Sequence, residues 1–101
     1  MKLYITQRNS SISAVGEYDL VSNAMTVLKG STVSDNIAHF RGAKTIEKNR
    51  KLVVKDGVVV EDITFTSPST AANFVTGRSS NGLIVWKDKA GRTLKTILME
   101  G

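Results

Sequence analysis

The stretch at residues 67–77 constrains the fold most, because it carries signals for both ends of a helix. Ser67 is a good N-cap, and Pro68 follows at the first helical position, where its missing N–H costs no hydrogen bond. Gly77 is a typical C-terminal stop. The apolar residues between these ends share one narrow stripe: Ala71, Phe74 and Val75. The pattern predicts a short helix over 68–76, which is stable only when it packs on the rest of the chain.

Most of the remaining sequence is typical of short strands. Residues 2–6, 12–19 and 24–29 are runs with β-branched or aromatic residues, and the connections between them are too short for crossover helices. This spacing predicts an antiparallel meander. The second run places four residues on one face: Ile12, Ala14, Gly16 and Tyr18. Residues 62–66 predict a further strand whose alternate side chains point inward.

The segment at residues 43–60 allows two interpretations. As a helix over 43–55 it buries apolar residues on one side and exposes lysines on the other, and Gly57 then follows as the stop. As a β-hairpin it turns at Asp56-Gly57, which is a strong two-residue turn signal between apolar runs. We favour the helix, because its exposed side places a glutamate four residues before a lysine. The two interpretations are treated as exclusive.

The C-terminal part begins with a tight-turn pair, Asn81-Gly82. It leads into residues 83–87, whose alternating pattern predicts a strand that completes a helix–turn–strand corner. Residues 88–92 predict a further turn, and residues 93–99 predict a strand or a short helix.

Together these elements predict an α+β fold: a mainly antiparallel sheet with two principal helices, near 43–55 and 68–76. At 101 residues the chain is long enough for one domain with one hydrophobic core, so we expect residues 1–101 to form a single domain. The expected core contains Phe65, Ala71, Phe74, Val75, Val85, Leu94 and Ile97.

The composition limits which kinds of site and which partners are possible for this chain. The chain has no cysteine, which excludes disulfides, thiolate zinc sites and cysteine nucleophiles. The first residues contain no apolar run long enough for a signal peptide or a membrane helix, so the expected location is the cytoplasm and no membrane partner is expected. The net charge of +5 would raise the local concentration of a polyanion.

Several catalytic and binding motifs fail on inspection. Gly77 and Gly82 have the spacing of a phosphate-binding P-loop, but Leu83-Ile84 stand where that motif needs lysine and a hydroxyl residue. His39 is the single histidine, so no histidine pair can hold a metal or form a catalytic dyad. The acidic residues show no facing pair for acid–base or metal catalysis. We therefore expect no enzyme activity, no metal, no cofactor and no small-molecule substrate.

The loop at residues 77–82 is the main candidate site, and two interpretations of it stay open. In the structural one, its glycines shape the corner, and Arg78 satisfies the helix C-terminal carbonyls and dipole. In the functional one, the loop contacts phosphate or a base edge with the help of nearby cations. The candidate nucleic-acid-binding residues are Arg78, Ser79, Ser80, Asn81, Lys87, Lys89 and Arg92.

A family resemblance supports an association with nucleic acid. It is carried by these residues in order: Val27-Leu28-Lys29-Gly30-Ser31, Asp56-Gly57, Phe65-Thr66-Ser67-Pro68-Ser69, Ala71-Ala72, Gly77-Arg78-Ser79, Asn81-Gly82 and Trp86-Lys87. This pattern resembles the small domain of unknown function that often follows a GIY-YIG endonuclease module. Its C-terminal part is similar to the "restriction enzyme adenine methylase associated" (RAMA) domain, which is predicted to bind DNA.

The resemblance implies an accessory role beside a nucleic-acid enzyme, with no catalysis of its own. The sequence departs from the pattern at Leu83, where the family usually has tryptophan, and this leaves Trp86 as the aromatic residue near the loop. No GIY-YIG signature is completed in this chain, so we expect the domain to act alone or with a catalytic partner on another chain.

Two hypotheses from different classes follow. The first is a module that binds DNA or another nucleic acid through a basic C-terminal surface. The second is an adaptor that docks on a nuclease, a methylase or its own copy. The first predicts binding with a steep salt dependence, whereas the second predicts an apolar patch and a discrete stoichiometry.

Overall fold

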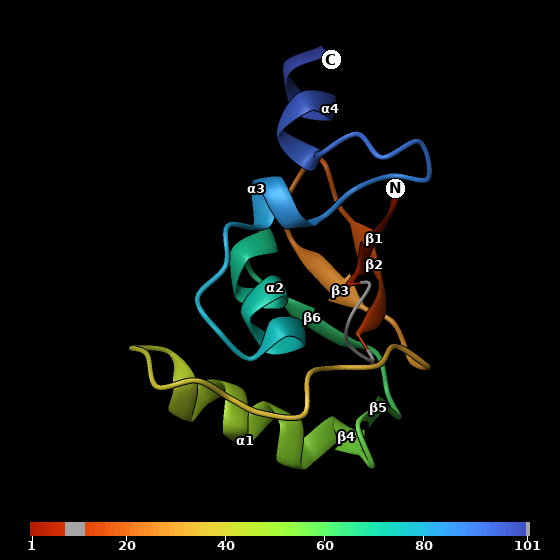
Figure 1. The fold of residues 1–101 in the computed structure, drawn as a ribbon. Coiled ribbons are helices and arrows are strands. Elements are labelled where there is room, and N and C mark those ends of the chain that lie inside the picture. Colours follow the sequence, from red (N-terminus) through yellow and green to blue (C-terminus); the bar gives the residue numbers. More distant parts are fainter. Residues whose placement is uncertain (8–11, 101) are drawn as a thin grey trace.

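The centre of the fold is an antiparallel sheet. A computed structural model describes residues 1–7 and 12–100 (Figure 1). Its four-stranded sheet has the order β1-β2-β3-β6, with every neighbouring pair antiparallel. The strands are β1 (Lys2–Thr6), β2 (Ser13–Tyr18), β3 (Met25–Val27) and β6 (Ile63–Phe65). The predicted meander and the strand at 62–66 are therefore confirmed, and the turn between the first two strands lies largely outside the described residues.

The sheet has one buried face and one polar face, as antiparallel sheets commonly do. Alternate residues of β1, such as Leu3 and Ile5, are buried, and so is the predicted face of the second strand. Lys2 and Thr6 point to the other face and are exposed, and Tyr4 between them is half-buried. Helix α2 (Pro68–Thr76) packs on β3 and β6, and its apolar stripe closes the core.

Helix α2 forms as its sequence predicts. The Ser67 hydroxyl accepts a hydrogen bond from the Thr70 backbone N–H at 3.2 Å, and Pro68 is the first helical residue. Gly77 ends the helix in the left-handed conformation, with φ of 73°. A Cβ atom there would lie 2.2 Å from the Asn36 carbonyl oxygen, so glycine is required by space as well as by conformation.

The segment at 43–60 contains both structures that the sequence suggested. Helix α1 (Ala43–Val53) is followed directly by a small hairpin of β4 (Val54–Lys55) and β5 (Val58–Val59). The expectation that helix and hairpin exclude each other was wrong. Asp56 and Gly57 both have positive φ, as a tight hairpin turn requires, so Gly57 shapes the turn and does not end the helix.

The C-terminal part differs from prediction at residues 83–87. A short helix, α3 (Gly82–Val85), replaces the expected strand. The Asn81 side chain accepts a hydrogen bond from the Leu83 N–H at 3.0 Å and so begins a helical turn. After the turn at 88–92, α4 (Leu94–Glu100) ends the described chain as a helix.

The core prediction is confirmed for Phe65, Ala71, Phe74, Val75 and Leu94, which are all buried. Val85 and Ile97 are only partly buried and pack against the core from α3 and α4. The α+β fold with an antiparallel sheet is therefore as the sequence predicts, with two additional helices at its C-terminal end.

Candidate nucleic-acid interface

The structure separates the seven predicted site residues into two groups. Residues 78–81 follow α2 and run along one side of it toward α3 (Figure 1). Residues 87–92 lie beyond α3, beside β1 and the amino terminus (Figure 1). The seven residues therefore do not form one continuous surface, and each group has its own environment.

In the first group, two of the four residues shape the corner. The Ser80 N–H donates to Asn73 Oδ1 at 2.8 Å, and the Ser80 hydroxyl lies 2.8 Å from the Thr76 hydroxyl. Asn81 caps α3, as described above. Arg78 and Ser79 are exposed, and the Arg78 side chain has no hydrogen bond or ion pair within the described residues. Arg78 is thus free to contact a ligand, and it does not satisfy the carbonyls of α2.

Arg50 of α1 performs the role that the structural interpretation gave to Arg78. Its guanidinium donates to the carbonyls of Phe74 and Ser34 at 2.8 Å each, and to the Ser34 hydroxyl at 2.9 Å. It also lies 6.0 Å from the Phe74 ring centre. Its half-buried position lowers the pKa of the Arg50 guanidinium from its usual value.

A sequence signal for Arg50 exists but was missed. Arg50 comes four residues after Ile46 and three before Val53, which are the two buried residues of α1. This spacing places it on the buried side of the helix, whereas the lysines of α1 are exposed. A basic residue on an apolar stripe indicates an internal hydrogen-bonding role.

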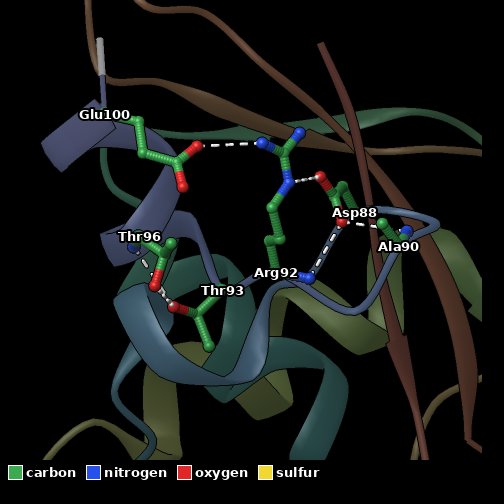
Figure 2. A network of polar contacts seen from close by, with 6 residues as sticks. All are labelled: Asp88, Ala90, Arg92, Thr93, Thr96 and Glu100. Carbon is green, nitrogen blue, oxygen red and sulfur yellow. Dashed lines mark hydrogen bonds and ion pairs between the residues drawn. The ribbon is translucent and has the colours of Figure 1, made fainter.

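In the second group, Arg92 is held by two carboxylates. Its Nε donates to Asp88 Oδ2 at 2.8 Å and its Nη1 donates to Glu100 Oε2 at 2.9 Å (Figure 2). Asp88 also accepts from the backbone N–H groups of Arg92 and Ala90 at 2.9 and 3.0 Å. The pKa of Asp88 is lowered, and the hydrogen bond that its carboxylate accepts from the Arg92 backbone N–H is the largest cause. The hydrogen bond between the two side chains in turn raises the pKa of Arg92.

Lys87 and Lys89 lie at the edge of β1 that does not pair with β2. The Tyr4 N–H donates to the Lys87 carbonyl at 2.7 Å, and the Lys87 N–H donates back to the Tyr4 carbonyl at 3.0 Å. A hollow of about 420 Å³ is lined by Lys2, Tyr4 and Lys89 together with Asp88 and Ala90. A second, of about 200 Å³, also contains Tyr4 and Lys89 and adds Lys87. We call Lys2, Tyr4, Lys87 and Lys89 the β1-edge surface.

Sequence reasoning missed Lys2 and Tyr4, because nothing local indicates that residue 87 pairs with residue 4. Trp86 is fully buried, and its Nε1 donates to the Pro68 carbonyl at 2.9 Å. Gly82 donates to the Ser69 hydroxyl at 2.9 Å, and a Cβ on it would lie 2.3 Å from the Pro68 carbonyl carbon. Much of the pattern Ser-Pro-Ser, Asn-Gly and Trp is therefore an internal packing motif.

Residues 3–98 match a family that is described as a domain of unknown function, DUF4357. The chain belongs to the DUF4357 family. Comparisons with curated proteins and with solved structures found no match. The architecture described above is thus that of a DUF4357 domain.

The described part of this DUF4357 domain offers cationic surfaces and no ligand cluster for a metal. No group of three His, Asp or Glu side chains within residues 1–7 and 12–100 is arranged to hold a metal ion. Over the same ranges, none of the helices combines the length and the apolar character needed to span a bilayer. Exposed lysines that have no carboxylate partner among the described residues give this arrangement a way to hold anions.

Proposed function

We propose that this DUF4357 domain is a non-catalytic accessory module that binds DNA or another nucleic acid through its basic C-terminal surface. The observation that carries the proposal is that the lysines of the β1-edge surface are exposed and unpaired among the described residues. Lys2, Lys87 and Lys89 are exposed, and none forms an ion pair within the described residues. Free lysines at one edge of a sheet are suited to phosphate contacts.

The carboxylates next to this surface are already engaged. Asp88 and Glu100 bind Arg92, and Glu17, which lies opposite Lys2 in the sheet register, binds the amino terminus at 2.9 Å. The three lysines therefore keep their charge available for a ligand. Arg78 adds a further exposed cation, unpaired within the part of the chain that the structure describes, on the other side of α2.

The family resemblance supports the same proposal by association. The pattern is similar to domains that accompany GIY-YIG endonucleases and to the RAMA domain, so a nucleic-acid enzyme is the expected functional partner. The role at such an enzyme would be to hold the substrate, and the chemistry would remain with the partner.

A salt-series binding assay tests the proposal. If Lys2, Lys87, Lys89 and Arg78 reach three or four phosphates, log affinity should fall against log salt with a slope of about −3 to −4 on duplex DNA. The dissociation constant should be about 10⁻⁴ to 10⁻⁶ M at physiological salt, as for sequence-independent contacts.

The matched variants remove the same charge from two places. Lys87→Gln with Lys89→Gln should make the slope shallower by about two, because two phosphate contacts are lost. The control pair, Lys48→Gln with Lys51→Gln on the exposed side of α1, should change the salt slope much less. Equal losses from the two pairs, or no binding at low salt by the unaltered chain, would overturn the proposed surface.

A second candidate function is a protein-interaction adaptor for a nuclease, a methylase or a second copy of the chain. It is favoured by apolar side chains that α3 and α4 expose: Leu83, Ile84, Leu98 and Met99. Their exposed fractions run from 38% to 77%, which is high for large apolar residues. Self-association measured by sedimentation, reduced by Ile84→Ser with Leu98→Ser and unaffected by salt, would favour the adaptor over the nucleic-acid module.

A further inference from the structure

Tyr4 differs from the other aromatic residues because it is partly exposed and its hydroxyl has no protein partner among the described residues. Tyr18, Phe65, Phe74 and Trp86 are buried. The Tyr18 hydroxyl donates to Asn23 Oδ1 at 2.5 Å, whereas the Tyr4 hydroxyl has no partner within the described residues. Phe40 is also half-buried, but its ring lies against the Gly42 backbone, 3.3 Å from where a Cβ would stand.

The sheet register places Tyr4 among the lysines. Tyr4 pairs directly with Lys87, so their side chains are neighbours on the same side of the sheet. Lys2 precedes Tyr4 by two residues in β1 and points to the same face. Both hollows at the β1-edge surface are lined by Tyr4 and by Lys89, which belongs to the turn at 88–92.

We propose that Tyr4 stacks on an unpaired base while Lys2, Lys87 and Lys89 hold the adjacent phosphates, so that the β1-edge surface prefers single-stranded nucleic acid. This rests on the proposed function and names its substrate class. Proteins that bind single strands combine aromatic platforms with cationic grooves, because an unstacked base has a free ring face. In a duplex both ring faces of a base are already stacked, so only the lysines would contribute.

The lysines of α1 lack this combination and serve as the control surface. Lys44, Lys48 and Lys51 are exposed on the side of the helix opposite Ile46 and Val53. No aromatic side chain belongs to α1 itself. They offer no ring on which a base could stack.

The test compares an oligothymidine strand with a DNA hairpin duplex, using the whole chain and four variants. Tyr4→Leu should weaken binding of the single strand about 5- to 100-fold, as expected for the loss of one base–aromatic contact. It should leave duplex affinity within about 2-fold and leave the salt slope for both ligands unchanged, because no charge is removed. Tyr4→Phe should bind the single strand like the unaltered chain, because the ring is retained.

The two lysine pairs complete the design. Lys87→Gln with Lys89→Gln should weaken both ligands and make both slopes shallower, and Lys48→Gln with Lys51→Gln should weaken neither by more than about 2-fold. If Tyr4→Leu leaves single-strand affinity unchanged while the Lys87 and Lys89 pair still weakens binding, stacking is overturned and the proposed function stands. If Tyr4→Leu weakens both ligands equally, or lowers the unfolding temperature as well, the stacking role is also overturned. If the unaltered chain binds neither ligand, both proposals fall.

Discussion

Arg50 and Arg78 both lie at the C-terminal end of α2, but they have opposite environments. Arg50 is half-buried and satisfies backbone carbonyls of α2 and of the loop at Ser34, whereas Arg78 is exposed. The difference shows that the structural interpretation of Arg78 gave the role of Arg50 to the wrong arginine. Nearness along the chain favoured Arg78, but the carbonyls of α2 are reached from α1, which precedes α2 by many residues.

We expect Arg50→Ala to lower the free energy of unfolding by about 2–3 kcal/mol, because the buried carbonyls that it satisfies would lose a charged donor. Arg50→Lys should recover part of that loss, since lysine keeps the charge but not the planar fork. Urea denaturation provides the measurement. A cost below about 0.5 kcal/mol for Arg50→Ala would contradict the assigned role.

Arg78→Ala is the matched change at an exposed position. It should alter the free energy of unfolding by no more than about 0.5 kcal/mol, while making the salt slope of DNA binding shallower by about one. Arg78 remains a predicted phosphate contact on a surface separate from Lys87 and Lys89. Destabilisation above about 1 kcal/mol with no nucleic-acid binding at low salt would instead place Arg78 in the architecture and favour the adaptor.

At the scale of elements, local sequence signals predicted a helix or strand correctly where tertiary packing favoured the same structure. Ser67, Pro68 and Gly77 predict both ends of α2, and the structure has the same ends. Residues 83–87 have the alternation of a strand, but Gly82 must approach the backbone of Pro68 closely and Trp86 must reach the Pro68 carbonyl. These tertiary contacts, together with the Asn81 cap, favour a helical turn over the local pattern.

Gly82 offers a direct test of this packing. Gly82→Ala should destabilise the domain by about 3 kcal/mol or more, because the added Cβ would meet backbone atoms that cannot rotate away. Gly91→Ala is the control. Gly91 has φ of 85° with no atom within 4 Å of its Cβ position, so only the conformational cost of about 1 kcal/mol is expected. Similar costs for the two variants, from urea denaturation, would contradict the close approach.

The turn at 88–92 should make stability depend on pH in acid. The lowered pKa of Asp88 means that its carboxylate stabilises the folded state above the unfolded pKa of about 3.9, and that this contribution is lost as pH falls through the lower folded pKa. Asp88→Asn should therefore be less stable than the unaltered chain at neutral pH, and the difference should shrink below about pH 4.

Urea midpoints measured at a series of pH values check this expectation. Asp19, whose pKa is also lowered, mainly by the Val21 backbone N–H, is a second acid-sensitive group in a different turn. Asp19→Asn should likewise be less stable than the unaltered chain at neutral pH, and this difference should shrink over the same acid range, independently of Asp88. A difference between Asp88→Asn and the unaltered chain that stays constant into strong acid would show that the carboxylate charge does not stabilise the turn.

For the whole molecule, the sequence predicted the fold class better than the site. Strand patterns, caps and short connections are local properties, and they were enough for an antiparallel sheet packed on α2. The candidate site depended on which distant segments become neighbours. The pairing of Tyr4 with Lys87 and the ion pairs of Arg92 are long-range or side-chain contacts, and hydropathy does not encode them.

The proposed lack of catalysis is also a property of the whole molecule. Purified protein should neither cleave DNA nor hydrolyse nucleotides when magnesium, manganese or zinc is added, because the expected function is binding alone. Gel-based cleavage and phosphate-release assays measure this. Metal-dependent turnover that persists through repurification and disappears when an acidic residue is replaced would contradict it.

The buried position of Trp86 also gives the domain an intrinsic optical probe. It is the single tryptophan of the chain, its ring lies against Gly16 and its indole N–H is bonded to Pro68, so it reports on the contact between the sheet and α2. Its emission should shift to longer wavelength when that contact opens to water. Because the indole is fully buried and Tyr4 points to the opposite face of the sheet, ligands at the β1-edge surface should leave this signal largely unchanged. Unfolding of every variant can thus be followed without a label, even in the presence of nucleic acid.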